Sequence, residues 1–231
     1  MATVLFDLAA SDPAVRFSPY CWRIRLALAH KAVKAETLAW RFTDKEAIAP
    51  SGQTTAPVLV DNGRWIGGSL QIADHLEAAY ADAPTLFGGP TGRALTEFFH
   101  SWADAVLLPG VFSLIALDVL QRLAPQDQPY FRASRERFLG TSIEVYASAR
   151  DTRISGVRES WRPLRQALRR QLFLGGEARH YADYIAFAAF QWARCMSPYA
   201  VMDDTDPLVD WRERMLDLHD GLARSAATLG A

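Results

Sequence analysis

The chain has 231 residues, of which half are hydrophobic and 22% are charged, and its formal net charge is −1. This composition is typical of a globular protein with a sizeable core, and the near-neutral charge excludes a general attraction to nucleic acid or anionic lipid. Two cysteines, Cys21 and Cys195, cannot form a disulfide framework or a four-cysteine zinc site. The longest uncharged apolar stretch, residues 105–117, is shorter than the ~20 residues of a membrane span, and the N-terminal residues have no apolar signal core. We therefore expect a cytoplasmic protein with no membrane or nucleic-acid partner.

The N-terminal third of the chain alternates between strand and helix signals. Four segments have strand character: residues 3–8, 37–42, 57–60 and 64–66. Asn62-Gly63 joins the last two as a hairpin, because this pair is typical of a tight primed turn. Ser18-Pro19 begins a helix that we expect to reach residue 30, and Ser69 caps a second helix through residue 80. We predict a small α/β domain over residues 1–82.

The segment from residue 83 to residue 92 contains two prolines and three glycines and predicts a linker. After it, strand alternation disappears and only helical patterns remain. These patterns cover residues 94–107, 111–123, 130–149, 159–172, 182–195 and 207–224. We therefore predict a second, all-α domain over residues 93–231.

Ser18 is the candidate catalytic residue. It lies where a loop enters a helix, and the free N–H groups and positive dipole end of a helix stabilise an anion such as a thiolate. Ser18-Pro19-Tyr20-Cys21 matches the redox motif Cys-Pro-Tyr-Cys with serine in place of the first cysteine. The substitution removes a nucleophilic thiol and keeps a hydroxyl donor, which predicts a site that activates the thiol of another molecule. The alternatives are a plain helix cap for Ser18 and either packing or reactivity for Cys21.

Two further segments predict binding of a small peptide-like anion. In Thr55-Ala56-Pro57 a proline begins a strand, and a cis bond there exposes the preceding backbone groups to a ligand. Gly68 and Ser69 begin the next helix, where a hydroxyl and free N–H groups can hold a carboxylate. Each segment alone is more typical of a structural turn or cap, but the combination with Ser18 is more specific.

Taken together, these patterns resemble the glutathione S-transferase superfamily over essentially the whole chain. The second-domain segments resemble most the bacterial glutathione-dependent β-etherases, which cleave lignin-derived aryl ethers, and the related fungal serine-type class. The residues that carry the resemblance are Ser18-Pro19-Tyr20, Trp22-Arg23, Asp61-Asn62-Gly63-Arg64-Trp65, Pro125-Gln126-Asp127, Ser134-Arg135-Glu136, Phe138-Leu139-Gly140, Leu174-Gly175-Gly176, Ala182-Asp183-Tyr184, Asp206-Pro207-Leu208 and Asp210-Trp211. The resemblance implies a thioredoxin-like N-terminal domain and an all-helical C-terminal domain.

The resemblance also implies roles for individual residues. Ser18 donates a hydrogen bond to the glutathione thiolate, and Ala56, beside Thr55 and a cis-Pro57, pairs through its backbone with the cysteinyl part. Ser69 binds the γ-glutamyl carboxylate. Asp183 corresponds to a structural capping aspartate, with His180 at the cap position in place of the usual Ser, Thr or Asn.

Gly68 departs from the family pattern, which has an acidic residue immediately before the serine matched by Ser69. The ammonium group of the γ-glutamyl part then lacks its usual counter-charge. Asp104 of a partner subunit is a candidate to supply it, since the resemblance implies a homodimer. Weak glutathione binding is the alternative.

The expected electrophile is a hydrophobic aromatic compound. Phe17, Leu108, Phe112 and Tyr199 are candidates to line its pocket, because ligand pockets are mostly apolar. The function implied is a serine-type glutathione transferase with glutathione as co-substrate, and β-aryl ether cleavage is the candidate reaction. The alternatives are a glutathione-dependent isomerase or peroxidase and a non-catalytic protein that binds glutathione or aromatic ligands. We expect no metal site, because the five histidines have no zinc-ligand spacing.

Overall fold

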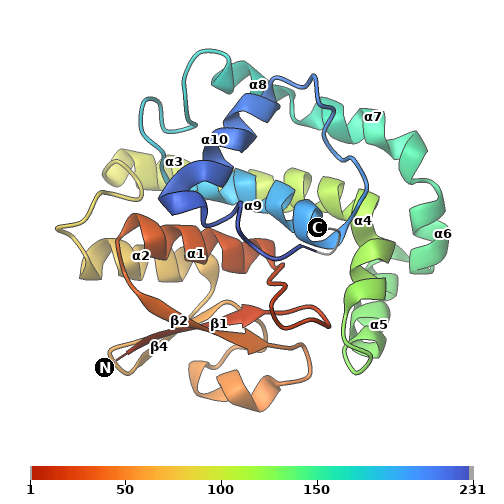
Figure 1. Ribbon diagram of the computed structural model, residues 1–231, viewed down its shortest axis with the longest axis horizontal. Helices are drawn as coiled ribbons and strands as arrows, with labels where there is room; N and C mark the ends of the chain where they lie inside the picture. Colours follow the sequence, from red (N-terminus) through yellow and green to blue (C-terminus); the bar gives the residue numbers. More distant parts are fainter. Residues whose placement is uncertain (1, 229–231) are drawn as a thin grey trace.

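A computed structural model describes residues 2–228 and contains a four-stranded sheet followed by a helical domain (Figure 1). The strands are β1 (Thr3–Leu8), β2 (Ala35–Trp40), β3 (Val58–Asp61) and β4 (Arg64–Gly67). Their order in the sheet is β2-β1-β3-β4, in which β1 and β2 are parallel and the other neighbours are antiparallel. Leu5 at the centre of β1 lies opposite Thr37 of β2 and Leu59 of β3.

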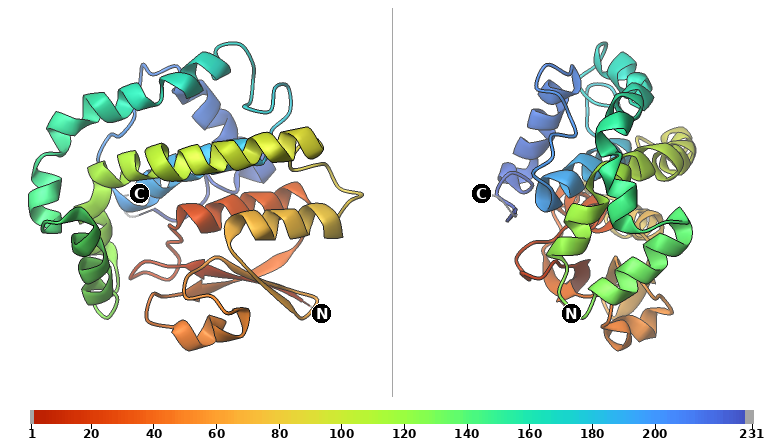
Figure 2. Two further views of the ribbon diagram at one scale, coloured as in Figure 1. Left: turned by 180° about the vertical axis from the view of Figure 1, so that it is seen from behind. Right: turned by 90° about the vertical axis from the view of Figure 1, so that its right-hand side faces the viewer.

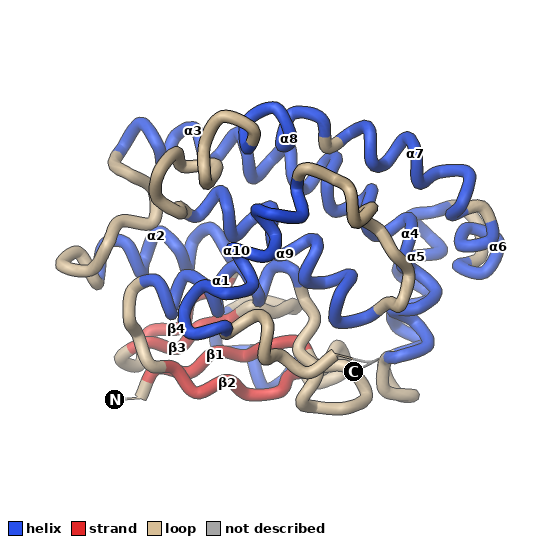
Figure 3. Tube along the Cα trace, turned by 45° about the horizontal axis from the view of Figure 1, so that its top comes forward, coloured by secondary structure: helices blue, strands red, loops and turns tan. Residues whose placement is uncertain are grey.

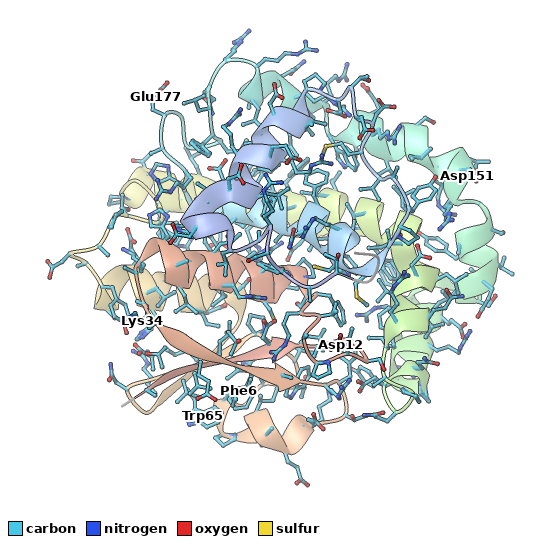
Figure 4. All side chains as sticks on the ribbon, in the orientation of Figure 1. Phe6, Asp12, Lys34, Trp65, Asp151 and Glu177 are labelled. Carbon is cyan, nitrogen blue, oxygen red and sulfur yellow. The ribbon has the colours of Figure 1, made fainter. Side chains whose placement is uncertain are left out.

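The two faces of the sheet have different neighbours. Helices α1 (Pro19–His30) and α2 (Ser69–Ala79) lie between the sheet and the helical domain, and Figure 3 shows the four strands side by side beneath the helices. The 3₁₀ segment η1 (Lys45–Ser51) lies on the opposite side of the sheet. There Phe6 and Trp65 stack with ring centroids 5.6 Å apart (Figure 4), because alternate strand residues point to opposite faces.

The helical domain is arranged around a buried central helix. Its elements are α3 (Pro90–Trp102), the π-helical segment η2 (Ala103–Leu107), α4 (Leu108–Arg122), α5 (Gln128–Leu139), α6 (Ile143–Ser148), α7 (Arg150–Ser160), α8 (Arg162–Leu168), α9 (Tyr181–Met196) and α10 (Leu208–Gly221). Helix α9 packs against α1 and α4, and its residues Ala186, Ala188 and Ala189 are fully buried. Small side chains at such positions let two helix backbones approach closely, so α9 joins the two domains.

The helix from α3 to α4 is continuous through η2, as the back view in Figure 2 shows. The sequence predicts two helices with a break around Pro109, and the structure instead widens the turn before the proline. A proline has no N–H and its ring crowds the preceding turn, so a π-helical turn accommodates it without ending the helix. By length and composition this helix could cross a membrane, but 61% of its most apolar part is buried inside the protein, as in the core helix of a soluble protein.

Several element boundaries differ from the predicted ones for local reasons. Helix α3 begins at Pro90, inside the predicted linker, because Gly89 caps it and proline is favoured in the first turn. The predicted helix over residues 130–149 ends at Gly140, which has a left-handed backbone with φ 68°. The sequence pattern did not predict α7. Gly68, rather than Ser69, is the N-cap of α2. The fold class itself, a thioredoxin-like α/β domain followed by an all-α domain, is confirmed.

A chain of polar rings crosses the contact between the domains. His30 of α1 lies with Nδ1 2.6 Å from the hydroxyl oxygen of Tyr184 in α9. His219 Nε2 lies 3.2 Å from the same oxygen, at a point where the backbone of α10 departs from helical geometry. Burial lowers the pKa of both histidines to about 4, so both rings are neutral at pH 7.

Candidate active site

Ser18 is the N-cap of α1, as the Ser18-Pro19 pair predicts. Its backbone is extended, with φ −59° and ψ 126°, and its Oγ accepts a hydrogen bond from the Cys21 N–H at 3.4 Å. This bond uses an oxygen lone pair and leaves the hydroxyl hydrogen available to a ligand. Ser18 therefore combines a donor with the positive end of a helix dipole, the arrangement that stabilises a thiolate.

Near the start of α1, residues of the first domain together with Glu97 and His100 of α3 line a cavity of about 310 Å³. Its lining includes all five residues that the sequence predicts for glutathione: Thr55, Ala56, Pro57, Gly68 and Ser69. The bond between Ala56 and Pro57 is cis, as in the family that the sequence resembles. The residues that the sequence analysis missed are Tyr20, Gln53, Leu70, Gln71, Glu97 and His100.

A second cavity, of about 480 Å³, adjoins the first and is mainly apolar. Both are lined by Tyr20, Thr55 and Ala56, and Ser18 lines the second. The other lining residues are Leu8, Phe17, Pro19, Phe42, Asp104, Leu108, Pro109, Phe112, Phe131, Arg135, Phe138, Tyr146 and Trp192. We call this second space the aromatic cavity and the first the polar cavity.

The side chains of the aromatic cavity pack against one another. Phe112 of α4 stacks on Trp192 of α9, with ring centroids 6.0 Å apart and an angle of 11° between the planes. Phe112 also contacts Phe131 of α5 and Tyr146 of α6. Side chains from four helices thus pack together in the lining of this cavity.

Three of the four pocket residues predicted from sequence line this cavity: Phe17, Leu108 and Phe112. The fourth prediction, Tyr199, is wrong. Its hydroxyl donates to Asp151 at 2.6 Å, and Figure 4 shows Asp151 at the outer edge of the helical domain. The loop after α9 carries Tyr199 to a separate surface hollow, which its place in the sequence does not reveal.

Cys21, the other reactive candidate, is fully buried. Burial raises the pKa of its thiol well above the usual value, and the neighbouring Asp7 carboxyl raises it further. A buried, protonated thiol is a poor nucleophile, so the packing alternative describes Cys21 better.

The structure also bears on the missing acid before Ser69. Asp104 is bound within its own chain, because the buried Arg23 guanidinium lies 2.9 Å from its Oδ1. The acidic residue that lines the polar cavity is instead Glu97 of α3, 2.9 Å from Arg93. Glu97 and His100 are three residues apart on one helix face, and this spacing is the signal that could have identified them.

Asp183 has the structural role that the resemblance implies. Its fully buried carboxylate accepts hydrogen bonds from the backbone N–H groups of Leu174 at 2.7 Å and His180 at 3.1 Å, and from the Trp211 indole at 3.1 Å. It therefore fixes the start of α9. Within residues 2–228, no group of His, Cys, Asp and Glu side chains is placed to hold a metal ion.

Comparison with known proteins agrees with these observations. The family model described as "Glutathione S-transferase, C-terminal domain" matches residues 94–215, and the one described as "Glutathione S-transferase, N-terminal domain" matches residues 13–84. A glutathione S-transferase of Arabidopsis thaliana is 24% identical over 178 residues, which cover 76% of this chain and 66% of that protein.

Solved structures of glutathione transferases have the same fold. A glutathione transferase of Phanerochaete chrysosporium is 27% identical, with a TM-score of 0.77 over 96% of this chain and 92% of that chain. A glutathione S-transferase of Ceriporiopsis subvermispora, solved in complex with glutathione, is 20% identical, with a TM-score of 0.84 over the full length of both chains. The matched domains, the fold and the paired cavities beside Ser18 agree, and the chain belongs to the glutathione S-transferase family.

Proposed function

We propose that this protein is a serine-type glutathione transferase that activates the glutathione thiol for attack on an aromatic electrophile. The observation that carries the proposal is the position of Ser18, which is the N-cap of α1 and lines the aromatic cavity where Tyr20, Thr55 and Ala56 join it to the polar cavity. A thiol with its sulfur beside Ser18 faces the aromatic cavity while its peptide part occupies the polar one.

Glutathione is the thiol that fits the polar cavity. The backbone of Ala56 before cis-Pro57 pairs with the cysteinyl part, and Ser69 at the start of α2 binds the γ-glutamyl carboxylate. Glu97 provides the counter-charge for the γ-glutamyl ammonium group. It takes the role of the acidic residue that the family has at the position of Gly68.

The reaction proposed is nucleophilic substitution. The Ser18 hydroxyl and the dipole of α1 lower the pKa of the bound thiol, whose proton passes to solvent. In the β-aryl ether reaction, the sulfur forms a bond to the carbon that bears the ether oxygen. The carbon–oxygen bond breaks, and the phenolate leaves with the electron pair and takes up a proton. Oxidation states balance without a further reactant.

Turnover with a panel of electrophiles tests this function. We expect glutathione-dependent release of phenol from a fluorogenic β-aryl ether ketone, in at least one enantiomer, to be faster than maleyl isomerisation or peroxide reduction. If a halonitroarene reacts while both enantiomers of the ether stay intact, the etherase assignment fails and the general transferase function remains. Glutathione binding without any turnover would instead favour the non-catalytic alternative.

The resemblance further supports a homodimer in the cytoplasm as part of this proposal. Analytical ultracentrifugation of the purified chain, with and without glutathione, measures the assembly directly. A monomer under both conditions rejects the dimer and leaves the catalytic proposal unchanged.

A further inference from the structure

Arg135 is a cation in a cavity that is otherwise nearly all apolar. It lies on α5 between Phe131 and Phe138, at helical spacings of four and three residues, and all three side chains line the aromatic cavity. Its guanidinium carbon lies 5.0 Å from the centroid of the Phe131 ring. This stacking holds the planar group at the edge of the space in which an aromatic substrate binds.

The charge of Arg135 has no carboxylate partner in the part of the chain that the structure describes. Its hydrogen bond there is a long one, 3.4 Å to Ser134 Oγ. By contrast, Arg132 on the same helix binds Glu136 at 2.8 Å and Glu144 at 2.6 Å. Burial lowers the pKa of Arg135, and the groups that act against this effect are the phenols of Tyr130 and Tyr20.

The acidic residue of the aromatic cavity does not neutralise this charge. Asp104 is bound by Arg23 at 2.9 Å and also accepts a hydrogen bond from Tyr20. Arg135 is partly buried, and a partly desolvated cation without a carboxylate partner gains from pairing with one. A guanidinium fork matches a carboxylate in geometry, so a substrate carboxylate would supply the missing partner.

We propose that Arg135 is a specificity-determining residue that binds a carboxylate on the aromatic substrate, so that the preferred electrophile is an aromatic acid. This inference deepens the proposed function, on which it rests, by naming the substrate class. The cavity of about 480 Å³ accommodates a substituted aromatic ring, with Ser18 and Arg135 both in its lining. The carboxylate binds Arg135 while the electrophilic carbon lies toward the glutathione sulfur.

A matched pair of substrates tests the proposal: 4-chloro-3,5-dinitrobenzoate and its primary amide. In both, the thiolate sulfur forms a bond to the ring carbon that bears chlorine, the carbon–chlorine bond breaks and chloride leaves with the electron pair. The pair differs in one charge. We expect Arg135→Gln to lower kcat/KM for the benzoate about 10- to 100-fold, mainly through KM, and to change the amide less than about threefold.

Two variants serve as controls. Arg135→Lys keeps the charge but loses the fork, so it should retain part of the preference for the acid. Arg137→Gln changes an exposed arginine of the same helix that is not part of the cavity and should leave both substrates unaffected. An equal loss for acid and amide in Arg135→Gln, with the loss absent in Arg137→Gln, overturns the proposal.

A binding measurement separates this inference from the proposed function. Calorimetric titration with 3,5-dinitrobenzoate, which has no leaving group, needs no activated thiol. The wild-type protein could bind 3,5-dinitrobenzoate in an Arg135-dependent way but conjugate glutathione to neither chlorinated substrate. In that case the transferase function fails and the carboxylate site remains. If conjugation is normal and the acid has no advantage, the carboxylate site fails. If Arg135→Gln slows only phenol release from a neutral aryl ether, the guanidinium serves the leaving phenolate and the substrate-carboxylate proposal is overturned.

Discussion

The polar cavity and the aromatic cavity share three residues but are built by different means. The polar cavity depends on backbone features of the first domain: a cis-proline, a glycine with positive φ and the start of α2. The aromatic cavity depends on side chains that come from as far apart as Leu8 and Trp192. One substitution can therefore reshape the aromatic cavity and leave the thiol site intact, which allows a family to keep one co-substrate while its electrophiles change.

Ser18 lines the aromatic cavity beside the three residues that line both cavities, and it is the proposed thiolate donor, so its replacement should have the largest effect. We expect Ser18→Ala to lower kcat for any electrophile about 10- to 100-fold, because a hydrogen bond to a charged acceptor contributes ~1.5–3 kcal/mol. Stopped-flow or steady-state kinetics at saturating glutathione measures this effect.

A matched control separates the loss of the hydrogen bond to the thiolate from the loss of the helix cap. Ser142 is the N-cap of α6 and accepts a hydrogen bond from Val145 N–H at 3.3 Å, as Ser18 does from Cys21, but it lies outside both cavities. Ser142→Ala should cost about 1 kcal/mol of stability and no turnover. An unchanged rate in Ser18→Ala would show that another donor serves the thiolate.

The two cavities adjoin only while the domains remain docked, and acid should weaken that docking. The pKa values of His30 and His219 are about 4 in the folded state and 6.5 when unperturbed. Between pH 6.5 and pH 4 the unfolded chain therefore binds protons that the folded chain does not. Stability should fall as the pH falls through this window, by about 1–3 kcal/mol for the pair after allowance for solvent screening.

Thermal melts across this pH range, on the wild type and on His219→Asn, check the assignment. Asparagine tolerates the left-handed backbone of residue 219, whose φ is 53°. The variant should lose about half of the acid-dependent change in stability. A pH dependence identical to that of the wild type contradicts the role assigned to this histidine.

Phe138 should affect the binding of the electrophile alone, whereas Ser18 should affect the activation of the thiol. Its side chain is 78% exposed and lines only the aromatic cavity. We expect Phe138→Ala to raise KM for an aromatic electrophile about three- to tenfold by removing apolar contact area. KM for glutathione and the melting temperature should stay unchanged. Phe98, 75% exposed and outside both cavities, is the matched control, and an equal effect of Phe98→Ala on the electrophile KM refutes a specific contact.

Gly68 should give the smallest effect. An acid there gains an ion pair of ~0.2–1 kcal/mol, but φ is 83°, which costs an L-residue about 1–2 kcal/mol. This strain opposes the gain that the sequence pattern alone suggests, so Gly68→Glu should not tighten glutathione binding. Glu97→Gln should weaken it up to about fivefold. Calorimetric titration of both variants with glutathione measures these affinities. A fivefold gain in glutathione affinity in Gly68→Glu would mean that Glu97 is not the counter-charge.

The contrast between the cavities also explains how far sequence reasoning could go. Ser18-Pro19, Ala56-Pro57 and Ser69 are local signals, since caps and prolines act on their own neighbours, and the structure places all of them in the two adjoining cavities. The aromatic cavity requires knowledge of which helices meet. Phe112 could be predicted, but its stacking partner Trp192 could not, and Tyr199 lies at a different surface hollow from the predicted one.

The domain interior shows the same limit. The pattern around Pro109 predicts a broken helix, because proline ends most helices. Tertiary packing of α4 against α9 instead keeps the helix continuous and places the irregularity in η2. Such an outcome depends on contacts far away in the sequence.

The uninterrupted helix from α3 to α4 connects the two cavities, because its residues line both of them. Glu97 lies along it at the polar cavity, and Leu108 and Phe112 lie further along the same rod at the aromatic cavity. If glutathione binding displaces this helix, the space for the electrophile changes with it. Linkage requires the coupling to be reciprocal: the factor by which glutathione changes electrophile affinity is the factor by which the electrophile changes glutathione affinity.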